Sequence, residues 1–265
     1  MRQYISQKYL DTNGLLTIIG KDYRYLRNVL RLVAGDMIHV RLPNGELEPM
    51  TVCQVDEKAK KISLQVCDLV EGAAGENQPE ETDSIENCEF TLFMAVPKSS
   101  KFDLIVRQAT ECGVAKIIPV QTEFSQVGAE KMNFRGERFE RIIKEARQQS
   151  GSPVNTKIEN CVSLAEACEI WKSQIQDLAP EESLGVVLYE RNESTVTILE
   201  ACAKKKNLKK TALFCGSEGG LSPEEVKSLS DSGFVPVHLK TNILRCETAA
   251  LYGIAALQVA NSNEE

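Results

Sequence analysis

The stretch Leu213-Phe-Cys-Gly-Ser-Glu-Gly-Gly-Leu-Ser-Pro223 decides the fold of the larger part of this chain. An apolar run ends at Cys215, a glycine-rich turn follows, and a helix start comes directly after it. Ser222 at the N-cap, Pro223 at the first helical position and Glu225 at the third are typical signals of a helix N-terminus. A strand, a tight turn and a helix in immediate succession predict a parallel α/β sheet, in which ligands bind at the carboxyl ends of the strands.

Other apolar runs share the character of the one that ends at Cys215. They are rich in Val, Ile, Leu and Phe and lack strict alternation, which is typical of parallel strands buried on both faces. These runs cover residues 90–96, 116–120, 184–189, 211–215 and 234–239. Helical stretches lie between them. Ser100 and Asp103 predict a capping box, and Gly113 and Gly233 predict helix ends.

The first part of the chain predicts a small β-rich domain. Asn44-Gly45 separates two extended runs, 36–42 and 47–55, which is a strong hairpin signal, and a third run covers 62–70. Apolar residues at helical spacing predict a helix over 21–32. Residues 71–89 hold seven acids and no base, and therefore predict an acidic linker. The expected domains are 1–70, 71–89 and 90–265.

Composition excludes several classes of protein. The 265 residues carry a net charge of −7, and no apolar run approaches the roughly 18 residues of a membrane span. The first ten residues lack the apolar core of a signal peptide. Nine scattered cysteines form no Cys-x-x-Cys pair, so a zinc knuckle or a thioredoxin motif is not available. We therefore expect a cytoplasmic protein without a membrane segment or a metal.

The glycine-rich turn matches neither of two familiar phosphate-binding motifs. No Lys follows its glycines, the spacing is not Gly-x-Gly-x-x-Gly, and Glu218 would repel a phosphate. A cofactor held by backbone amides fits better, and a plain tight turn is the alternative. After the last strand, 239–251 contains a short polar loop and then a helix that begins near Glu247. Arg245 and Glu247 flank that start; a surface ion pair is the alternative there.

Taken together, GSEGGLSPEEV (216–226) and LKTNILRCETAALYGIAALQ (239–258) resemble the signature of the SPOUT-class methyltransferases. The specific resemblance is to the ribosomal RNA small subunit methyltransferase E family. Further stretches that match this family, in the same order, are 28–32 with Gly35-Asp36, 96–98 and 108–114. The resemblance therefore extends over both expected domains.

This resemblance implies an enzyme that methylates N3 of a uridine in 16S ribosomal RNA of the small subunit, with S-adenosylmethionine as cofactor. It implies a homodimer, a C-terminal α/β domain with a trefoil knot and a parallel sheet, and a small PUA-like β-barrel before it. Three loops would hold the cofactor, mainly through backbone. The implied cofactor residues are Tyr189, Leu213, Cys215, Gly216, Glu218, Gly219, Gly220, Leu239, Asn242, Ile243, Leu244, Thr248 and Ala249.

The chemistry of a uridine N3 suggests the catalytic residues. N3 carries a proton and becomes a good nucleophile only when that proton leaves. Arg245 is the candidate that stabilises the developing oxyanion, and Glu218 or Glu247 would accept a proton or hold Arg245 in place. A basic footprint is expected for RNA binding. Its candidates are Arg2, Arg24, Arg27, Arg31, Lys98, Lys101, Arg107 and Arg147.

The chain departs from the family pattern at several positions. Ser217 and Asn242 stand where proline and arginine are usual, Tyr25 replaces a frequent histidine, and 148–154 lacks the one or two arginines usual there. Two other functions stay open: a SPOUT methyltransferase with another RNA target, such as a ribose 2′-oxygen of tRNA, and a non-catalytic RNA-binding ribosome-assembly factor. A nucleophilic Cys215 or Cys246 is a further alternative, although no neighbouring base is implied.

Overall fold

The structure is a computed structural model that describes residues 3–67, 88–190, 195–203 and 205–261. The chain divides into two compact units. The first unit comprises Met1–Pro79 and Arg147–Pro153, and the second comprises Glu80–Ala146 and Val154–Glu265. The acidic linker predicted over 71–89 lies, as far as residue 87, outside the described residues, so the predicted domain boundaries stay predictions.

The first unit is built on a five-stranded sheet with the order β1-β3-β4-β5-β2. Its strands are β1 (Gln3–Ile5), β2 (Leu15–Ile19), β3 (Met37–Arg41), β4 (Leu47–Asp56) and β5 (Lys61–Val66). The hairpin predicted at Asn44-Gly45 is confirmed, because β3 and β4 pair antiparallel across it and Gly45 has φ +94°. Within the described residues no ladder joins β1 to β2, so the sheet is a curled half-barrel rather than a closed barrel.

The helix predicted over 21–32 is shorter and changes its winding. It begins as α1 (Gly20–Arg24) and continues as a π-helical turn, η1 (Tyr25–Val29). Tyr23 and Leu26 bury their side chains in the core of the sheet. Arg31, just beyond, has φ +59°, which ends the helical backbone.

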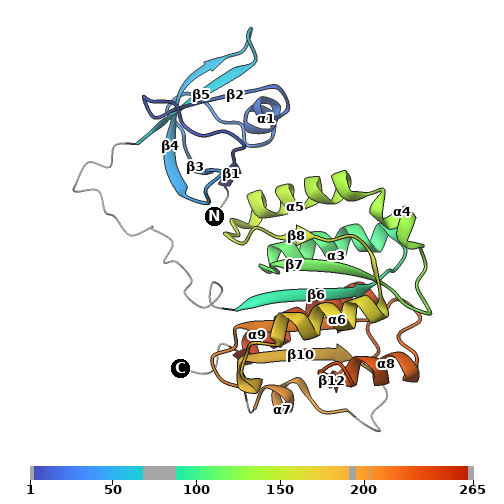
Figure 1. The fold of residues 1–265 in the computed structure, drawn as a ribbon. Helices are drawn as coiled ribbons and strands as arrows, with labels where there is room; N and C mark the ends of the chain where they lie inside the picture. The colour runs from blue at the N-terminus through green and yellow to red at the C-terminus, as the bar shows by residue number, and fades with distance from the viewer. Residues whose placement is uncertain (1–2, 68–87, 191–194, 204, 262–265) are drawn as a thin grey trace. The chain divides into compact units, whose positions relative to one another are not determined.

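The second unit is a parallel sheet with the order β12-β10-β11-β6-β7-β8, and β9 pairs with β7 (Figure 1). The five strands predicted from apolar runs are confirmed as β6 (Glu89–Ala95), β7 (Lys116–Gln121), β10 (Ser183–Leu188), β11 (Lys210–Cys215) and β12 (Phe234–Val237). Two short strands were not predicted: β8 (Lys157–Ile158) and β9 (Val162–Ser163).

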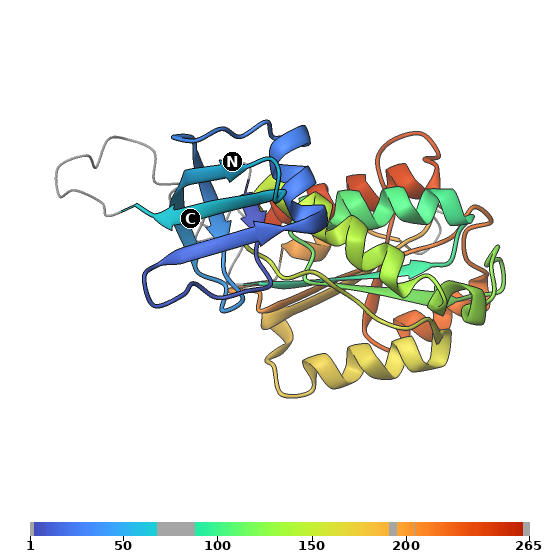
Figure 2. The same ribbon diagram turned by 90° about the horizontal axis from the view of Figure 1, so that it is seen from above.

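Helices cover both faces of this sheet (Figure 2). They are α3 (Ser99–Glu111), α4 (Ala129–Asn133), α5 (Gly136–Ser150), α6 (Leu164–Ile175), α7 (Ile198–Cys202), α8 (Pro223–Ser230) and α9 (Cys246–Asn261), with a 3₁₀ turn at Pro180–Glu182. Leu92 and Met94 of β6 pack into a core with α3, α5, α7 and α9. Phe93 and Ala95 alternate to the other face and pack with α6 and α8. The result is the three-layer α/β fold that the sequence predicts.

The predicted helix ends are confirmed in most cases. Ser222 accepts a hydrogen bond from the backbone N–H of Glu225, as the capping box of α8 requires. Gly113 follows α3 with φ +76°, the conformation expected of a residue just past a helix. The capping box predicted at Ser100 and Asp103 is wrong. The helix begins at Ser99, and the Asp103 carboxylate instead binds two arginines of the α4–α5 region.

Candidate active site

A pocket of about 790 Å³ lies at the carboxyl ends of β10, β11 and β12. Three separate segments of the chain line it: 188–190, 215–220 and 237–246, together with Ala249. Lys101 of α3 completes the lining. The sequence predicts a site at this edge because the ends of parallel strands meet there, and the pocket lies where that prediction puts it.

Eleven of the thirteen predicted cofactor residues line this pocket, and Leu213 and Thr248 do not. Leu213 is an interior residue of β11, and its side chain packs against Gly253 of α9. Thr248 is exposed on α9. Sequence reasoning missed the lining residues Leu188, Val237 and His238, which end or directly follow β10 and β12, because these strands carry no motif.

In the glycine turn after β11, the backbone of Gly216 packs directly against the backbone of Gly220. A Cβ atom on Gly216 would lie 2.9 Å from the carbonyl carbon of Gly220, so no side chain fits there. Gly220 has φ +73°, a conformation that glycine adopts without strain, and its N–H donates to the Ser217 carbonyl at 3.0 Å. The turn therefore needs glycine at both ends, and it presents main chain to the pocket.

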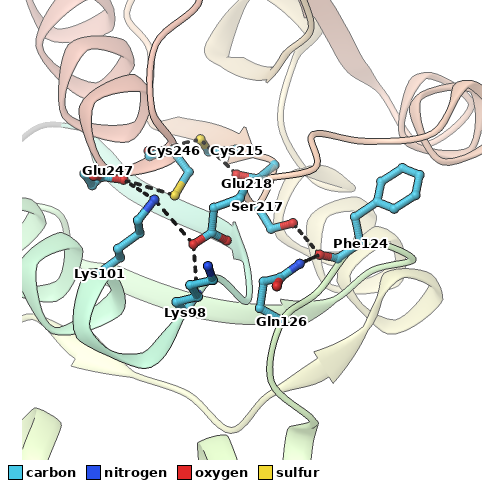
Figure 3. A network of polar contacts seen from close by, with 10 residues as sticks. Lys98, Lys101, Phe124, Gln126, Cys215, Ser217, Glu218, Cys246 and Glu247 are labelled. Atoms are coloured by element: carbon cyan, nitrogen blue, oxygen red, sulfur yellow. Dashed lines mark hydrogen bonds and ion pairs between the residues drawn. The ribbon is translucent and has the colours of Figure 1, made fainter.

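Two side chains fasten this turn to the loop that follows β7. The Ser217 hydroxyl donates to the Phe124 carbonyl at 2.8 Å (Figure 3). The buried Glu225 carboxylate accepts from the backbone N–H of Glu123 at 2.8 Å and from that of Ser222 at 3.0 Å. The serine at the position where the family usually has proline thus adds a hydrogen bond that proline lacks.

The predicted catalytic carboxylates meet at one lysine (Figure 3). The Lys101 ammonium lies 3.4 Å from Glu218 Oε1 and 3.2 Å from Glu247 Oε2. Glu218 also accepts from the backbone N–H of Lys98 at 3.2 Å. Burial alone would raise the pKa of Glu247, but its own backbone N–H, the Cys246 thiol and Lys101 together hold that pKa below its ordinary value.

Arg245 lines the same pocket from an exposed position before α9. Within the part of the chain that the structure describes, it forms no ion pair with Glu218 or Glu247, because both carboxylates pair with Lys101. Because these two described carboxylates pair with Lys101 instead, the expectation that one of them holds Arg245 in place stays a prediction. The guanidinium instead faces solvent at the pocket, where a ligand can reach it.

The two cysteines beside the pocket are neutral thiols. Burial raises the pKa of Cys215 well above its ordinary value, and its thiol donates weakly to the Cys246 carbonyl at 3.7 Å. Burial and the neighbouring carboxylates raise the pKa of Cys246 to about 12. Since the thiolate is the reactive form, neither residue is an activated nucleophile.

The residues predicted to bind RNA do not share one environment. Arg2 lies outside the described residues. Arg24, Arg31, Lys98 and Arg107 are exposed, and Arg27 pairs with Glu57 at 2.9 Å. Lys101 lies in the pocket rather than on a basic face.

Arg147 is buried within the first unit, contrary to the expectation of a phosphate contact. It is 8% exposed, and its side chain donates to the Pro153 carbonyl at 3.2 Å. Burial, together with nearby Arg41, lowers its pKa. The carbonyls of Arg147 and Ser152 both accept from the Gln3 side chain at 3.1 Å, and Gln148 accepts from the Ile5 N–H at 3.3 Å. The segment without the family's arginines is thus held to β1.

The described residues contain no group of three or more His, Cys, Asp or Glu side chains that could hold a metal ion. They also contain no helix that is long and apolar enough to cross a membrane.

Comparison with known proteins places this geometry among similar chains. A family model described as an RNA methyltransferase domain matches residues 84–258. The chain is 30% identical over 244 residues to ribosomal RNA small subunit methyltransferase E of Aquifex aeolicus, covering 87% of this chain and 94% of that protein. It is 27% identical over 261 residues to ribosomal RNA small subunit methyltransferase E 2 of Borreliella burgdorferi, covering 96% of each.

Solved structures share the fold. The ribosomal RNA small subunit methyltransferase E of Neisseria gonorrhoeae, bound to S-adenosyl methionine, superposes with a TM-score of 0.74 at 22% identity and 98% coverage of both chains. A putative methyltransferase of Legionella pneumophila in complex with the same cofactor gives 0.74 at 24% identity, covering 98% of this chain and 97% of that one.

Proposed function

Because the chain belongs to the ribosomal RNA small subunit methyltransferase E family, we propose that it methylates N3 of a uridine in 16S ribosomal RNA. It is an S-adenosylmethionine-dependent RNA methyltransferase of the SPOUT class. The observation that carries the proposal is the pocket, built from backbone at the ends of three parallel strands, with Arg245 and Glu218 on its lining.

The residues of the pocket fit S-adenosylmethionine. Its volume of about 790 Å³ lies within the roughly 300–1,000 Å³ of ordinary ligand pockets. The close contact of Gly216 with Gly220 forms a cradle without side chains, where backbone amides and carbonyls can reach a ligand. Glu218 and Glu190 place negative charge on the lining, which suits a sulfonium cation. When bound, this cofactor supplies an electrophilic methyl group.

The polar residues have distinct roles in the proposed reaction. Arg245, exposed at the pocket, is placed to stabilise the charge that develops on uracil oxygen when N3 loses its proton. Glu218 lines the pocket and Glu247 does not, so Glu218 is the proposed proton acceptor, and Glu247 supports it through Lys101. The walls of the pocket would align N3 with the methyl group, which is the other requirement of methyl transfer.

The rest of the proposal concerns the whole protein. We propose that the segment 239–246 takes part in a trefoil knot, and that the curled sheet of the first unit is a PUA-like RNA-binding domain. We also propose a homodimer located in the cytoplasm. The exposed face of α9 supports the dimer: Thr248, Tyr252, Ala255 and Val259 follow helical spacing there, and three of the four are apolar or aromatic.

The first test is cofactor binding. Calorimetric titration with S-adenosylhomocysteine is expected to show micromolar affinity for the wild type and none for Gly220→Trp, because Gly220 has φ +73°, which strains any side chain, and an indole there would occupy the pocket that Gly220 lines. Gly45→Trp, at a surface hairpin in the first unit, is the matched control and should bind normally. If the folded wild type shows no binding, the enzyme proposal fails, and a ribosome-assembly factor becomes the better explanation.

The second test is the reaction itself. Small subunits lacking the modification, incubated with the protein and S-adenosylmethionine, are expected to gain N3-methyluridine in their RNA, detected by mass spectrometry of nucleosides. Arg245→Ala is expected to lower kcat by about 10²-fold, the usual effect of removing a donor that stabilises an oxyanion. A 2′-O-methylated nucleoside instead would support the alternative RNA target.

A further inference from the structure

The side chain of Lys101 joins two carboxylates that lie far apart in the sequence. It extends from the first turn of α3 to Glu218, in the turn after β11, and to Glu247, in the first turn of α9 (Figure 3). The two distances, 3.4 Å and 3.2 Å, are nearly equal, so one ammonium serves both carboxylates. The sequence gives no signal that Lys101 lies between two carboxylates, since a lysine on a helix most often lies in solvent.

This cluster is shielded from water more than a surface ion pair. The side chains of Lys101, Glu218 and Glu247 are 27%, 21% and 15% exposed. Glu218 receives a second donor, the backbone N–H of Lys98, and Glu247 accepts weakly from the Cys246 thiol at 3.3 Å. Each carboxylate is therefore held by Lys101 and by at least one further group of its own, and Lys101 is the group that they share.

Charge explains why this shared group matters. Two carboxylates held near each other without a cation repel, and such a pair retains one proton to a higher pH than a single carboxyl group does. The groups that face Lys101 are Glu218, Glu247 and Cys246, on the turn after β11 and on α9. Burial alone would lower the pKa of Lys101, but Glu247 and Glu218 raise it, so the ammonium stays charged over the working range of an enzyme.

We infer that Lys101 is a positioning residue, which keeps Glu218 and Glu247 ionised and in one place at the wall of the pocket. The inference rests on the proposed function, because Glu218 serves there as the proton acceptor. An acceptor must be deprotonated before the reaction begins. Lys101 thus acts through Glu218 and not on the substrate.

The first experiment measures the pH profile of methyl transfer. Lys101→Met is expected to move the acidic limb of kcat upward by about one pH unit, because the carboxylate pair then holds a proton. At pH values on the acidic side of the wild-type limb, this shift lowers kcat about tenfold relative to the wild type. Lys101→Arg keeps the cation and is expected to restore the limb. The matched control is Lys172→Met, which removes a lysine from an exposed ion pair with Glu169 on α6. If Lys101→Met has the profile of this control, the inference is wrong.

The second experiment needs no activity. We expect the stability of Lys101→Met to fall relative to the wild type as pH rises from 5 to 8. A carboxyl pair whose pKa is raised in the folded state loses its contribution as pH rises through that value. Adding Glu247→Gln removes the repulsion and should abolish the trend. A stability difference that does not change with pH overturns the inference. Absence of methyl transfer in the wild type would instead overturn only the proposed function.

Discussion

Gln148 begins the segment 148–154, which lacks the arginines usual in the family, and its packing shows which side chains that place permits. Its side chain is 3% exposed, and it accepts from the Ile5 backbone beside the buried Arg147. An arginine at this place would add a second buried cation close to Arg147, whose pKa is already lowered by burial and by Arg41. The neutral side chain is therefore the one that this packing permits.

Introducing an arginine at position 148 should therefore destabilise the protein. Gln148→Arg is expected to lower the free energy of unfolding by about 2 kcal/mol or more, because a buried charge without a partner is costly. The measurement is urea unfolding followed by circular dichroism. Gln149→Arg, at the exposed neighbouring position, is the control and should change stability little. Equal effects of the two substitutions would contradict this explanation.

Glu89, at the start of β6, predicts a dependence on pH. Burial alone would raise its pKa, but Lys210 and Lys116 together hold it below its ordinary value. A lowered pKa stabilises the fold above the unfolded value, and the contribution is lost as pH falls through the folded value. Glu89→Gln is thus expected to cost up to about 1 kcal/mol at pH 7, since the pair is partly screened, and nothing in strong acid. Unfolding at several pH values measures this, with the same substitution at the exposed Glu159 (Glu159→Gln) as the control.

At the scale of elements, most strands could be predicted and the polar contacts between them could not. Strands β6, β7, β10, β11 and β12 are buried on both faces, so their apolar runs are unmistakable. The capping box expected at Ser100 was wrong because Asp103 has stronger partners in Arg135 and Arg138. The position of Lys101 was missed for a similar reason: its partners come from other elements, and local pattern carries no information about them.

The capping box of α8 has a second role, and this makes a prediction. Glu225 caps its own helix and also holds the backbone of Glu123 in the loop after β7. Glu225→Ala is expected to cost about 2–3 kcal/mol, since two charge-assisted bonds from backbone N–H groups to this buried carboxylate are lost. Glu166 forms the equivalent box of α6 at the surface, and Glu166→Ala should cost less. Urea unfolding of both variants measures the difference. Equal losses of stability in the two variants would contradict the second role of Glu225.

At the scale of the whole molecule, the exposed face of α9 predicts the state of assembly. Tyr252 and Val259 are 48% and 62% exposed on a helix whose opposite face is buried in the core. Tyr252→Glu is expected to shift the protein from dimer to monomer in sedimentation equilibrium, because a charge replaces apolar contact area. Leu199→Glu, equally apolar and more exposed on α7, is the control and should leave the dimer intact. A wild type that sediments as a monomer contradicts the proposal.

The first unit is not continuous in the chain, and this has a consequence for gene shuffling. Residues 147–153 belong to it, and their carbonyls and Gln148 provide partners for β1. A crossover placed in the acidic stretch 71–89 would join β1 of one parent to the 147–153 segment of another. Hybrids between distant parents should then carry mismatched contacts at Gln3 and Ile5, whereas hybrids that inherit both pieces together should fold. The two pieces of the first unit must therefore come from the same parent, although they are encoded far apart on the gene.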